Sequence, residues 1–486
     1  MTLPRLWVLM TVAAAFMGPA SSPIGLPDIF WTLQSGQWMV AHGRLLDFDP
    51  FTSAPHVSGA VLNVQWLADL AYYWLDASGG LALVIVGTAV AVMVTYAIVL
   101  AAAITASGHL RLSCVAVWAA YALGVTNLSS RPQTLAYPLF AVFLLAIVRA
   151  EWRQDRRLLW LLPLLTVIWA NVHGSFFTGW LLLACAAGGR LLQRPIDWRG
   201  ARPYLATLIA CVLASMVTPY GPGSLVYLVH IGSNPIVRDF VTEWAPTTIE
   251  SPGGVLFFGA VALVAGLMLR ARLRLTRFEL LTMLAFGLLA WTSVRSVVWF
   301  GLVIAPTLAR LLASALPRRR TVARERPLLN SAIALAVVAL AALSTPWIKS
   351  AVPFLPADKQ TLVSPVDAPA GVGNYLSTHD PPPTGTMLNF ETWGGYLNWA
   401  AWPRHQAFVD GRIELHPTQV WLDYVAIVFP KAGWRTLLDQ YDISYLVLST
   451  AEVPELVDDL RVDPGWRLDY EDAQAVVFTR SAVPPP

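Results

Sequence analysis

The sequence predicts a polytopic α-helical membrane protein that carries a small α/β domain at its C-terminal end. Of its 486 residues, 56% are hydrophobic and only 13% are charged, whereas soluble globular chains have about 25% charged residues. The apolar residues gather in runs long enough to cross a bilayer, and arginines cluster in alternate connections between these runs. After residue 347 the character changes to a polar pattern of short strands and helices.

About eleven runs are apolar enough to cross the membrane, given that a spanning helix needs roughly 17–25 mostly apolar residues and neighbouring helices can support shorter ones. The first run could also be the apolar part of a signal peptide, but Arg5 is its only flanking basic residue. We therefore expect a retained helix. The predicted spans are residues 4–20, 81–105, 113–127, 134–148, 157–171, 175–190, 204–219, 253–270, 277–293, 297–315 and 329–346.

The arginines predict the orientation of these spans. Loops rich in Lys and Arg remain in the cytoplasm. The N-terminus is therefore expected in the cytoplasm, and residues 21–80 and everything after 347 are expected outside it. The 21 tryptophans suit the two membrane interfaces. Four loops are rich in arginine and alternate with loops that are poor in basic residues: 149–157, 190–202, 270–277 and 318–326.

The regions outside the spans divide into three parts. The first external loop, 21–80, is expected to hold two helices lying in the interface, at 29–42 and 61–76, because both are too polar to span and carry apolar residues at helical spacing. The transmembrane domain would end at residue 346. Residues 347–385 are rich in proline and polar residues and are expected to form a linker.

Residues 386–486 are expected to form a small extracytoplasmic α/β domain. Its stretch from Thr392 to Trp402 is rich in aromatic residues and glycine, which suits either carbohydrate contact or a buried helix–strand junction. Asp410-Gly-Arg412 could be a turn with a local ion pair or part of a binding site. The predicted strands are 385–389, 406–410, 443–448 and 474–479, and the predicted helices lie near 393–400 and 429–440.

Composition excludes some classes of function. The net charge of +3 is small and the basic residues form short clusters, so nucleic-acid binding is not expected. Cys114, Cys185 and Cys211 all lie inside apolar runs. We therefore expect buried thiols and no disulfide framework.

Polar and ionisable residues outside the arginine-rich loops fall at the external ends of the helices. Such residues are costly at membrane depth and point to function by default. Some have ordinary explanations, since Asp28 could cap the helix that follows it, and Asp47 and Asp49 could form a turn before Pro50. The set comprises Asp28, Asp47, Asp49, Arg131, Asn171, His173, Asp239, Glu243 and Arg295.

The other residues of this set also have ordinary structural explanations. His173 could be a turn residue before Gly174. Arg295 could extend its side chain to the interface, and Glu243 could pair with Arg238 on the surface. Carboxylates, a histidine and isolated arginines on one side of the membrane are nevertheless harder to explain together than singly.

This set of side chains suits group transfer from a lipid-phosphate donor. Arginine binds phosphate through its planar fork of donors, and a carboxylate near the acceptor can remove its proton in one direct displacement. A carboxylate pair could also hold a divalent cation such as Mg²⁺ or Mn²⁺, for which Asp47 and Asp49 are weak candidates. The candidates for substrate binding are Arg295, Arg131, His173, Asn171, Glu243 and Asp49.

Several short motifs carry a family resemblance. Pro27-Asp-Ile-Phe-Trp-Thr-Leu-Gln-Ser-Gly-Gln-Trp-Met-Val-Ala-His-Gly43, followed by Asp49-Pro50-Phe-Thr, resembles the first external loop of GT-C fold glycosyltransferases, which include oligosaccharyltransferase catalytic subunits and protein mannosyltransferases. The whole chain more closely resembles uncharacterised bacterial multi-pass proteins near that superfamily. The further matching motifs are Arg131-Pro-Gln, Trp169-Ala-Asn-Val-His-Gly-Ser, Glu243-Trp, Arg295, Trp393-Gly-Gly-Tyr-Leu and Asp410-Gly-Arg412.

The resemblance implies a role for Asp28, which matches the acidic residue that acts as catalytic base or metal ligand in GT-C enzymes. Several subfamilies have a second acidic residue beside it, whereas Ile29 follows here, so a metal site would depend on Asp47 and Asp49. The resemblance also implies a polyprenyl-phosphate sugar as donor. The membrane would be the bacterial cytoplasmic membrane, with the C-terminal domain outside.

The sequence thus predicts a membrane glycosyltransferase that moves a sugar to an extracytoplasmic lipid, glycan or protein, with Asp28 as base. The alternatives are a non-catalytic envelope scaffold and a transporter or flippase of a lipid-linked substrate. Transporters usually place charges near the bilayer midplane and contain repeats. Here the charges lie at the outer ends of the spans and no repeat is visible.

Overall fold

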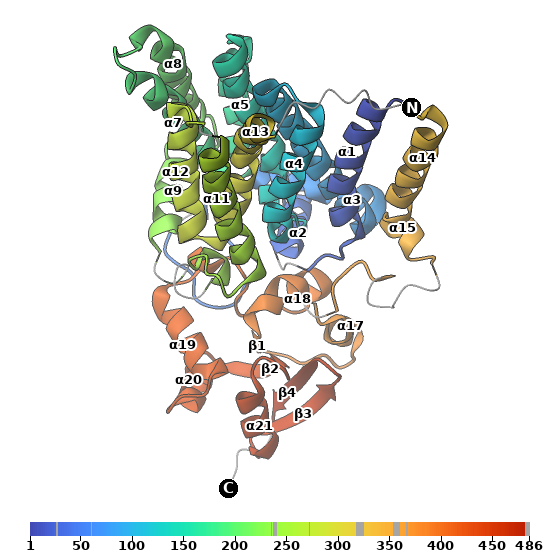
Figure 1. Cartoon of the computed structure of the whole chain (residues 1–486). Coiled ribbons are helices and arrows are strands. Elements are labelled where there is room, and N and C mark those ends of the chain that lie inside the picture. The colour runs from blue at the N-terminus through green and yellow to red at the C-terminus, as the bar shows by residue number, and fades with distance from the viewer. Residues whose placement is uncertain are drawn as a thin grey trace.

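A bundle of helices stands over a small α/β domain, with the N-terminus at the end of the bundle that is far from this domain (Figure 1). The architecture is that of a computed structural model. It describes residues 1–25, 28–59, 61–234, 236, 241–271, 273–316, 325–352, 360–365 and 368–481. Asp239 and Arg238 therefore lie outside the described residues.

Every predicted span overlaps a helix of the bundle. Within the described residues, six segments are long and apolar enough to cross a membrane, and others are shorter apolar helices. The chain is a multi-pass membrane protein, and the number of eleven spans remains a prediction. The bundle helices are α1 (Leu3–Ser21), α3 (Trp66–Ser107), α4 (Leu110–Gly124), α5 (Pro132–Arg153), α6 (Leu162–Val172), α7 (Phe177–Leu191), α8 (Trp198–Ala214), α11 (Pro252–Ala271), α12 (Arg277–Thr292), α13 (Val297–Ala315) and α14 (Pro327–Leu343).

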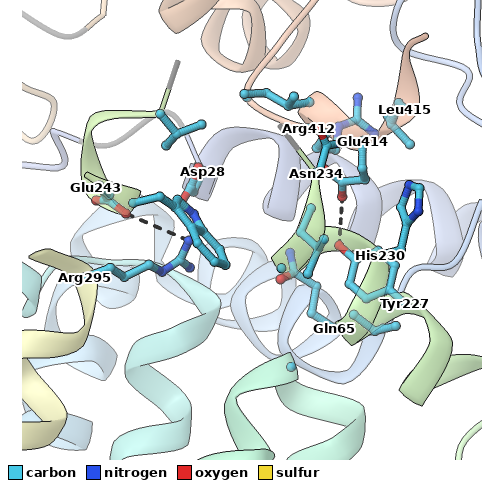
Figure 2. Close-up of a pocket in the computed structure, with 18 of the residues that line it drawn as sticks. Asp28, Gln65, Tyr227, His230, Asn234, Glu243, Arg295, Arg412, Glu414 and Leu415 are labelled. Atoms are coloured by element: carbon cyan, nitrogen blue, oxygen red, sulfur yellow. Dashed lines mark hydrogen bonds and ion pairs between the residues drawn. The ribbon is translucent and has the colours of Figure 1, made fainter. Parts of the chain in front are cut away.

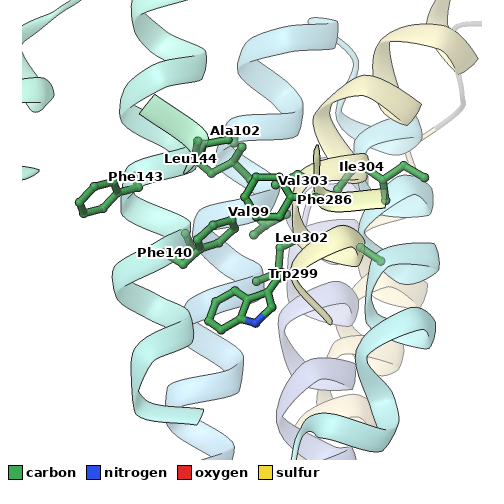
Figure 3. Close-up of a cluster of buried hydrophobic side chains, with 14 of the residues drawn as sticks. Val99, Ala102, Phe140, Phe143, Leu144, Phe286, Trp299, Leu302, Val303 and Ile304 are labelled. Atoms are coloured by element: carbon green, nitrogen blue, oxygen red, sulfur yellow. The ribbon is translucent and has the colours of Figure 1, made fainter. Parts of the chain in front are cut away.

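The core of the bundle surrounds α13. Phe140 of α5 packs edge-on against Trp299 of α13, with ring centroids 5.0 Å apart, and against Phe286 of α12 (Figure 3). On the other side, a Cβ at Gly301 would lie 2.9 Å from the carbonyl oxygen of Ala120, so glycine permits close packing of α13 on α4. Small residues at such contacts are how helices associate in a bilayer.

The first external loop contains α2 (Asp28–His42), close to the predicted helix at 29–42. The helix predicted at 61–76 is confirmed in part as a separate element, since helical backbone begins at Trp66 and breaks before the span predicted at 81–105. Residues from Trp66 onward belong to α3, which is interrupted at Gly79 and Gly80. Gly80 has φ of 65°, a conformation that glycine adopts without penalty, so the glycine pair separates two helices within α3.

Three of the arginine-rich loops meet at one end of the bundle. Glu151, Arg190 and Arg277 line a small cavity there, and Nη2 of Arg190 lies 2.9 Å from Oε1 of Glu151. The fourth loop falls mostly at 317–324, outside the described residues. The meeting of three basic loops is what a shared cytoplasmic side requires, and the orientation itself remains a prediction.

Shorter helices connect the spans at the end that faces the α/β domain. They hold the turns in which most of the candidate residues lie, and α9 was not predicted. They are α9 (Gly223–Ser233), α15 (Pro346–Lys349), and the single turns η3 (Gly174–Phe176), η4 (Thr242–Trp244) and η5 (Val294–Ser296).

The α/β domain contains a four-stranded sheet in the order β1-β2-β4-β3, with β1 parallel to β2 and the other pairs antiparallel. The predictions at 385–389, 443–448 and 474–479 are confirmed as strands. The elements are β1 (Thr386–Asn389), β2 (Ile443–Ser449), β3 (Trp466–Glu471), β4 (Ala475–Arg480), η6 (Glu391–Trp393), η7 (Ile413–Leu415), α17 (Ala370–Thr378), α18 (Gly394–Ala401), α19 (Thr418–Val428), α20 (Trp434–Gln440) and α21 (Pro454–Val462).

The predicted strand at 406–410 was wrong. The backbone of this segment forms hydrogen bonds with side chains and with the first external loop, and not with a neighbouring strand. Asn398 Oδ1 accepts from the Ala407 N–H at 2.9 Å, and Asn389 Oδ1 accepts from the Phe408 N–H at 2.7 Å. The carbonyl of Ala407 accepts from an N–H of the first external loop at 2.9 Å. This extended segment therefore joins the two parts of the molecule.

Candidate active site

A cavity of about 1290 Å³ lies between the end of the bundle and the α/β domain. It exceeds the usual range of about 300–1,000 Å³ for small-molecule pockets. Polar side chains occupy two sides of it (Figure 2). Of the candidates predicted from the sequence, five line this cavity: Asp28, Arg131, His173, Glu243 and Arg295.

Glu243 is held between two arginines. Nη1 of the fully buried Arg131 donates to both Glu243 oxygens, at 2.7 and 2.9 Å, and Nη1 of Arg295 lies 3.9 Å from Glu243 Oε2. Burial opposes ionisation of Glu243, but the two guanidiniums outweigh it and hold the pKa of this carboxyl below its usual value. Glu243 is therefore ionised, and its negative charge holds the side chains of both arginines in place.

Arg295 and His173 form a pair of neighbouring donors. Nδ1 of His173 accepts the backbone N–H of Ser175 at 3.0 Å, which assigns the ring proton to Nε2. Nε2 lies 3.4 Å from Nη2 of Arg295, whose Nε donates to Gln133 Oε1 at 2.6 Å. Burial, then Arg295 and Arg131, lower the pKa of His173 well below its usual value, so the ring is neutral.

This arrangement has a chemical consequence. Both Nη2 of Arg295 and Nε2 of His173 carry hydrogens, so neither accepts from the other. Within the described residues they have no other acceptor. Two adjacent donors, one of them charged, suit the oxygens of a phosphate group.

Asp28 stands at the first position of α2 and lines the same cavity. It makes no ion pair with any side chain among the described residues. Burial raises the pKa of the Asp28 carboxyl and Glu243 adds to this, while Arg131 and Arg295 oppose it. A half-buried carboxylate that is free of a cation and has a raised pKa is suited to accept a proton.

Asn171 and Asp47 do not line the cavity. The Asn171 amide accepts from Nε1 of Trp66 at 2.8 Å and donates to two backbone carbonyls, so it ties α6 to the start of α3. Asp47 forms an exposed pair with Arg44 at 3.2 Å. Both side chains are already occupied by partners elsewhere.

Asp49 also lies outside the lining of the cavity. It accepts from the Thr52 N–H at 3.0 Å, as expected of a turn residue, and Nη1 of Arg412 lies 2.9 Å from its Oδ1. Burial opposes ionisation of Asp49, but Arg412 outweighs it and holds the pKa of this carboxyl well below its usual value. Arg412 also pairs with Asp410 at 2.6 Å, so it links the first external loop to the α/β domain.

Asp47 and Asp49, the candidates for binding a divalent cation, are not arranged to bind one together. Asp47 and Asp49 are engaged by different arginines. In the part of the chain that the structure describes, no three or more His, Cys, Asp or Glu side chains gather closely enough to hold a metal ion.

Several cavity residues were missed by the sequence analysis. The hydroxyl of Tyr227 donates to Oε1 of Glu414 at 2.9 Å (Figure 2), which joins α9 to the α/β domain. Glu391 and Gln65 also line the cavity. No pattern in the sequence marks these residues, although Glu391 stands just before the motif that begins at Trp393.

No family model matches the sequence, and no curated protein matches it. Solved structures do match the fold. The archaeal oligosaccharyltransferase AglB from Archaeoglobus fulgidus, in complex with an inhibitory peptide and a dolichol-phosphate, matches with a TM-score of 0.59 and 11% identity, over 99% of this chain and 75% of that one.

Two further solved structures match the fold of this chain. The arabinofuranosyltransferase AftD from Mycobacteria matches with a TM-score of 0.57 and 16% identity, over 99% of this chain and 40% of that one. ArnT from Cupriavidus metallidurans, in the apo state, matches with a TM-score of 0.54 and 13% identity, over 98% of both chains. The chain is thus a multi-pass membrane protein with the fold of the GT-C membrane glycosyltransferases. The resemblance carried by its short motifs is confirmed at the level of fold.

Proposed function

We propose that the protein is a membrane glycosyltransferase that transfers a sugar from a polyprenyl-phosphate carrier to an extracytoplasmic acceptor. One observation carries this proposal. Among the described residues, Nη2 of Arg295 and Nε2–H of His173 lack an acceptor, Asp28 lacks a paired cation, and all three side chains line a single cavity. The dolichol-phosphate in the AglB structure supports a lipid-phosphate donor.

The donor's phosphate would bind at the donor pair. Nη2 of Arg295 and Nε2–H of His173 donate to its non-bridging oxygens, and Glu243 and Gln133 keep the Arg295 guanidinium in place. Negative charge grows on the phosphate as its bond to the sugar breaks. Donors that are already aligned stabilise this charge more in the transition state than in the bound donor.

Asp28 would act as the base in one direct displacement. As the acceptor oxygen bonds to the anomeric carbon, its proton passes to the Asp28 carboxylate, and the lipid phosphate leaves with the electron pair of the broken bond. A single displacement inverts the configuration at the anomeric carbon. The raised pKa of Asp28 makes it a stronger base than an exposed aspartate.

The test uses the full-length protein in lipid nanodiscs. Purified protein is incubated with a panel of radiolabelled polyprenyl-phosphate sugars and with lipid, glycan and peptide acceptors, and transfer of label to the acceptor is measured together with release of polyprenyl phosphate. Asp28→Asn is expected to lower turnover by about 10²–10⁴-fold, the usual contribution of a general base. Asp47→Asn, on the exposed surface of the same loop, is the matched control. A well-folded Asp28→Asn variant with wild-type turnover would exclude Asp28 as the base.

A further inference from the structure

Two carboxyl groups from distant parts of the chain face one small space. Asp28 begins α2, and Glu391 begins η6 in the α/β domain. A Cβ placed on Gly411 would lie 3.7 Å from Asp28 Oδ1 and 3.8 Å from Glu391 Oε1. Both oxygens therefore border the space that a side chain at position 411 would fill, and all three residues line the cavity.

Glu391 forms no ion pair with any side chain that the structure describes. Its one side-chain partner among the described residues is the Thr392 hydroxyl, which donates to Oε2 at 3.3 Å. The nearby Arg412 is taken up by Asp410 and Asp49. The other oxygen of Glu391 is therefore available to a ligand, as is the carboxylate of Asp28.

The backbone around Glu391 is fixed. Its N–H donates to the Tyr424 hydroxyl at 2.6 Å, and this hydroxyl donates to the carbonyl of Asn389 at 3.2 Å. A Cβ at Gly394 would lie 2.2 Å from the carbonyl oxygen of Val409, so only glycine permits this close approach. The Trp-Gly-Gly motif thus brings Glu391 to the cavity wall.

The surroundings of Glu391 favour its protonated form. Burial raises the pKa of Glu391 to about 7, Thr392 opposes the shift, and Asp410 and Asp28 add to it. Near neutral pH Glu391 can therefore carry a proton and donate a hydrogen bond, while the Asp28 carboxylate accepts one.

We infer that Glu391 and Asp28 together bind the reacting group of the acceptor beside Gly411, and that this group is a hydroxyl, as on a sugar, and not an amine. This inference rests on the proposed transferase function. A hydroxyl can donate to the Asp28 carboxylate and accept from the Glu391 acid, whereas an ammonium group only donates. In the transfer step Asp28 takes the hydroxyl proton, the oxygen bonds to the anomeric carbon, the phosphate leaves, and Glu391 keeps its own proton.

The first experiment measures binding without any donor. Methyl glycosides of a hexose and a pentose, and the corresponding amino sugars, are titrated calorimetrically into wild-type protein in nanodiscs. The methyl glycosides are expected to bind best, and Glu391→Gln and Gly411→Ala are each expected to weaken them about tenfold, the effect of one hydrogen bond. Glu452→Gln, an exposed glutamate of the same domain, is the matched control. Failure of the glycosides to bind, or tighter binding of the amino sugars, would overturn the inference.

The second experiment separates the inference from the proposed function. With a donor that the wild type uses, Glu391→Gln should raise KM for the acceptor and leave KM for the donor unchanged. Wild-type binding of the acceptor should weaken as pH rises through about 7 and Glu391 ionises, and the variant should lose this dependence. An active wild type with unchanged acceptor KM and pH profile in Glu391→Gln would overturn the inference alone. Glycoside binding without turnover on any donor would count against the transferase function instead.

Discussion

The guanidinium of Arg131 and the carboxylate of Glu243 form an ion pair of two hydrogen bonds, 2.7 and 2.9 Å long. Arg131 is fully buried, and the Glu243 side chain is 30% exposed on the cavity wall. The pair joins the turn before α5 to η4 and leaves the second arginine, Arg295, on the open side of Glu243. One carboxylate therefore organises both cations of the candidate site.

Glu243→Gln should destabilise the protein, because it leaves the buried Arg131 without its anion. Breaking a buried ion pair costs about 3–5 kcal/mol, and we expect about 3 kcal/mol since Glu243 is partly exposed. Chemical unfolding in detergent measures the change. Glu250→Gln, an exposed glutamate nearby, should leave the free energy of unfolding unchanged, and an equally stable Glu243→Gln variant would contradict the role given to the pair.

Arg295→Lys should weaken use of the donor. Lysine keeps the charge but loses the planar fork that bonds Gln133 and reaches toward His173. We expect KM for the lipid-phosphate donor to rise about tenfold, with the acceptor KM unchanged, as measured by initial rates at varied donor concentration. The control is Arg274→Lys, an exposed arginine on the opposite side of the bundle.

The pH dependence of transfer should have an acid limb set by Asp28. The base must be ionised, and because burial raises its pKa, activity should fall at a pH above the usual aspartate value of about 4. Rates of single turnover between pH 4 and 8 measure this limb. A rate that stays constant down to pH 4 would show that Asp28 does not titrate as described.

His173 should contribute no limb to that profile. Burial and the two nearby arginines lower its pKa well below the usual histidine value of about 6.5, so the ring is neutral at neutral pH and acts only as a hydrogen-bond donor. His173→Gln should therefore lower the rate without changing the shape of the profile between pH 6 and 8. A limb near pH 6.5 that disappears in His173→Gln would mean that the ring is charged when the site is active.

Asp49→Asn should loosen the junction between the first external loop and the α/β domain. Arg412 outweighs burial and keeps the pKa of Asp49 well below its usual value, so the ion pair stabilises the fold above about pH 4 and is lost only as pH falls through the lowered pKa. At neutral pH we expect faster proteolysis of the loop than in the control Asp47→Asn. Equal rates would show that this ion pair does not hold the loop.

Much of the bundle could be predicted from the sequence because apolar runs and arginine-rich loops act locally. The same reasoning grouped five of the cavity residues, since the external ends of neighbouring helices must lie near each other. It could not distinguish Asn171 from His173, two residues apart, because Trp66 takes up the Asn171 amide only in the folded bundle.

The cavity residues that belong to the α/β domain could not be predicted from such local patterns. Glu391 and Glu414 reach the cavity only through the docking of one part of the chain on another, which no periodicity encodes. The predicted strand at 406–410 failed for a related reason. Two buried asparagines replace the backbone partners that a strand would need.

The cavity is walled on one side by bundle residues and on the other by the α/β domain. The side that holds the donor pair belongs to the helical bundle, and the side with Glu391 belongs to the α/β domain. Under the proposed transferase function, exchange of the α/β domain between related chains would change the acceptor while the lipid carrier stays the same. Acceptor choice would then diverge independently of donor choice.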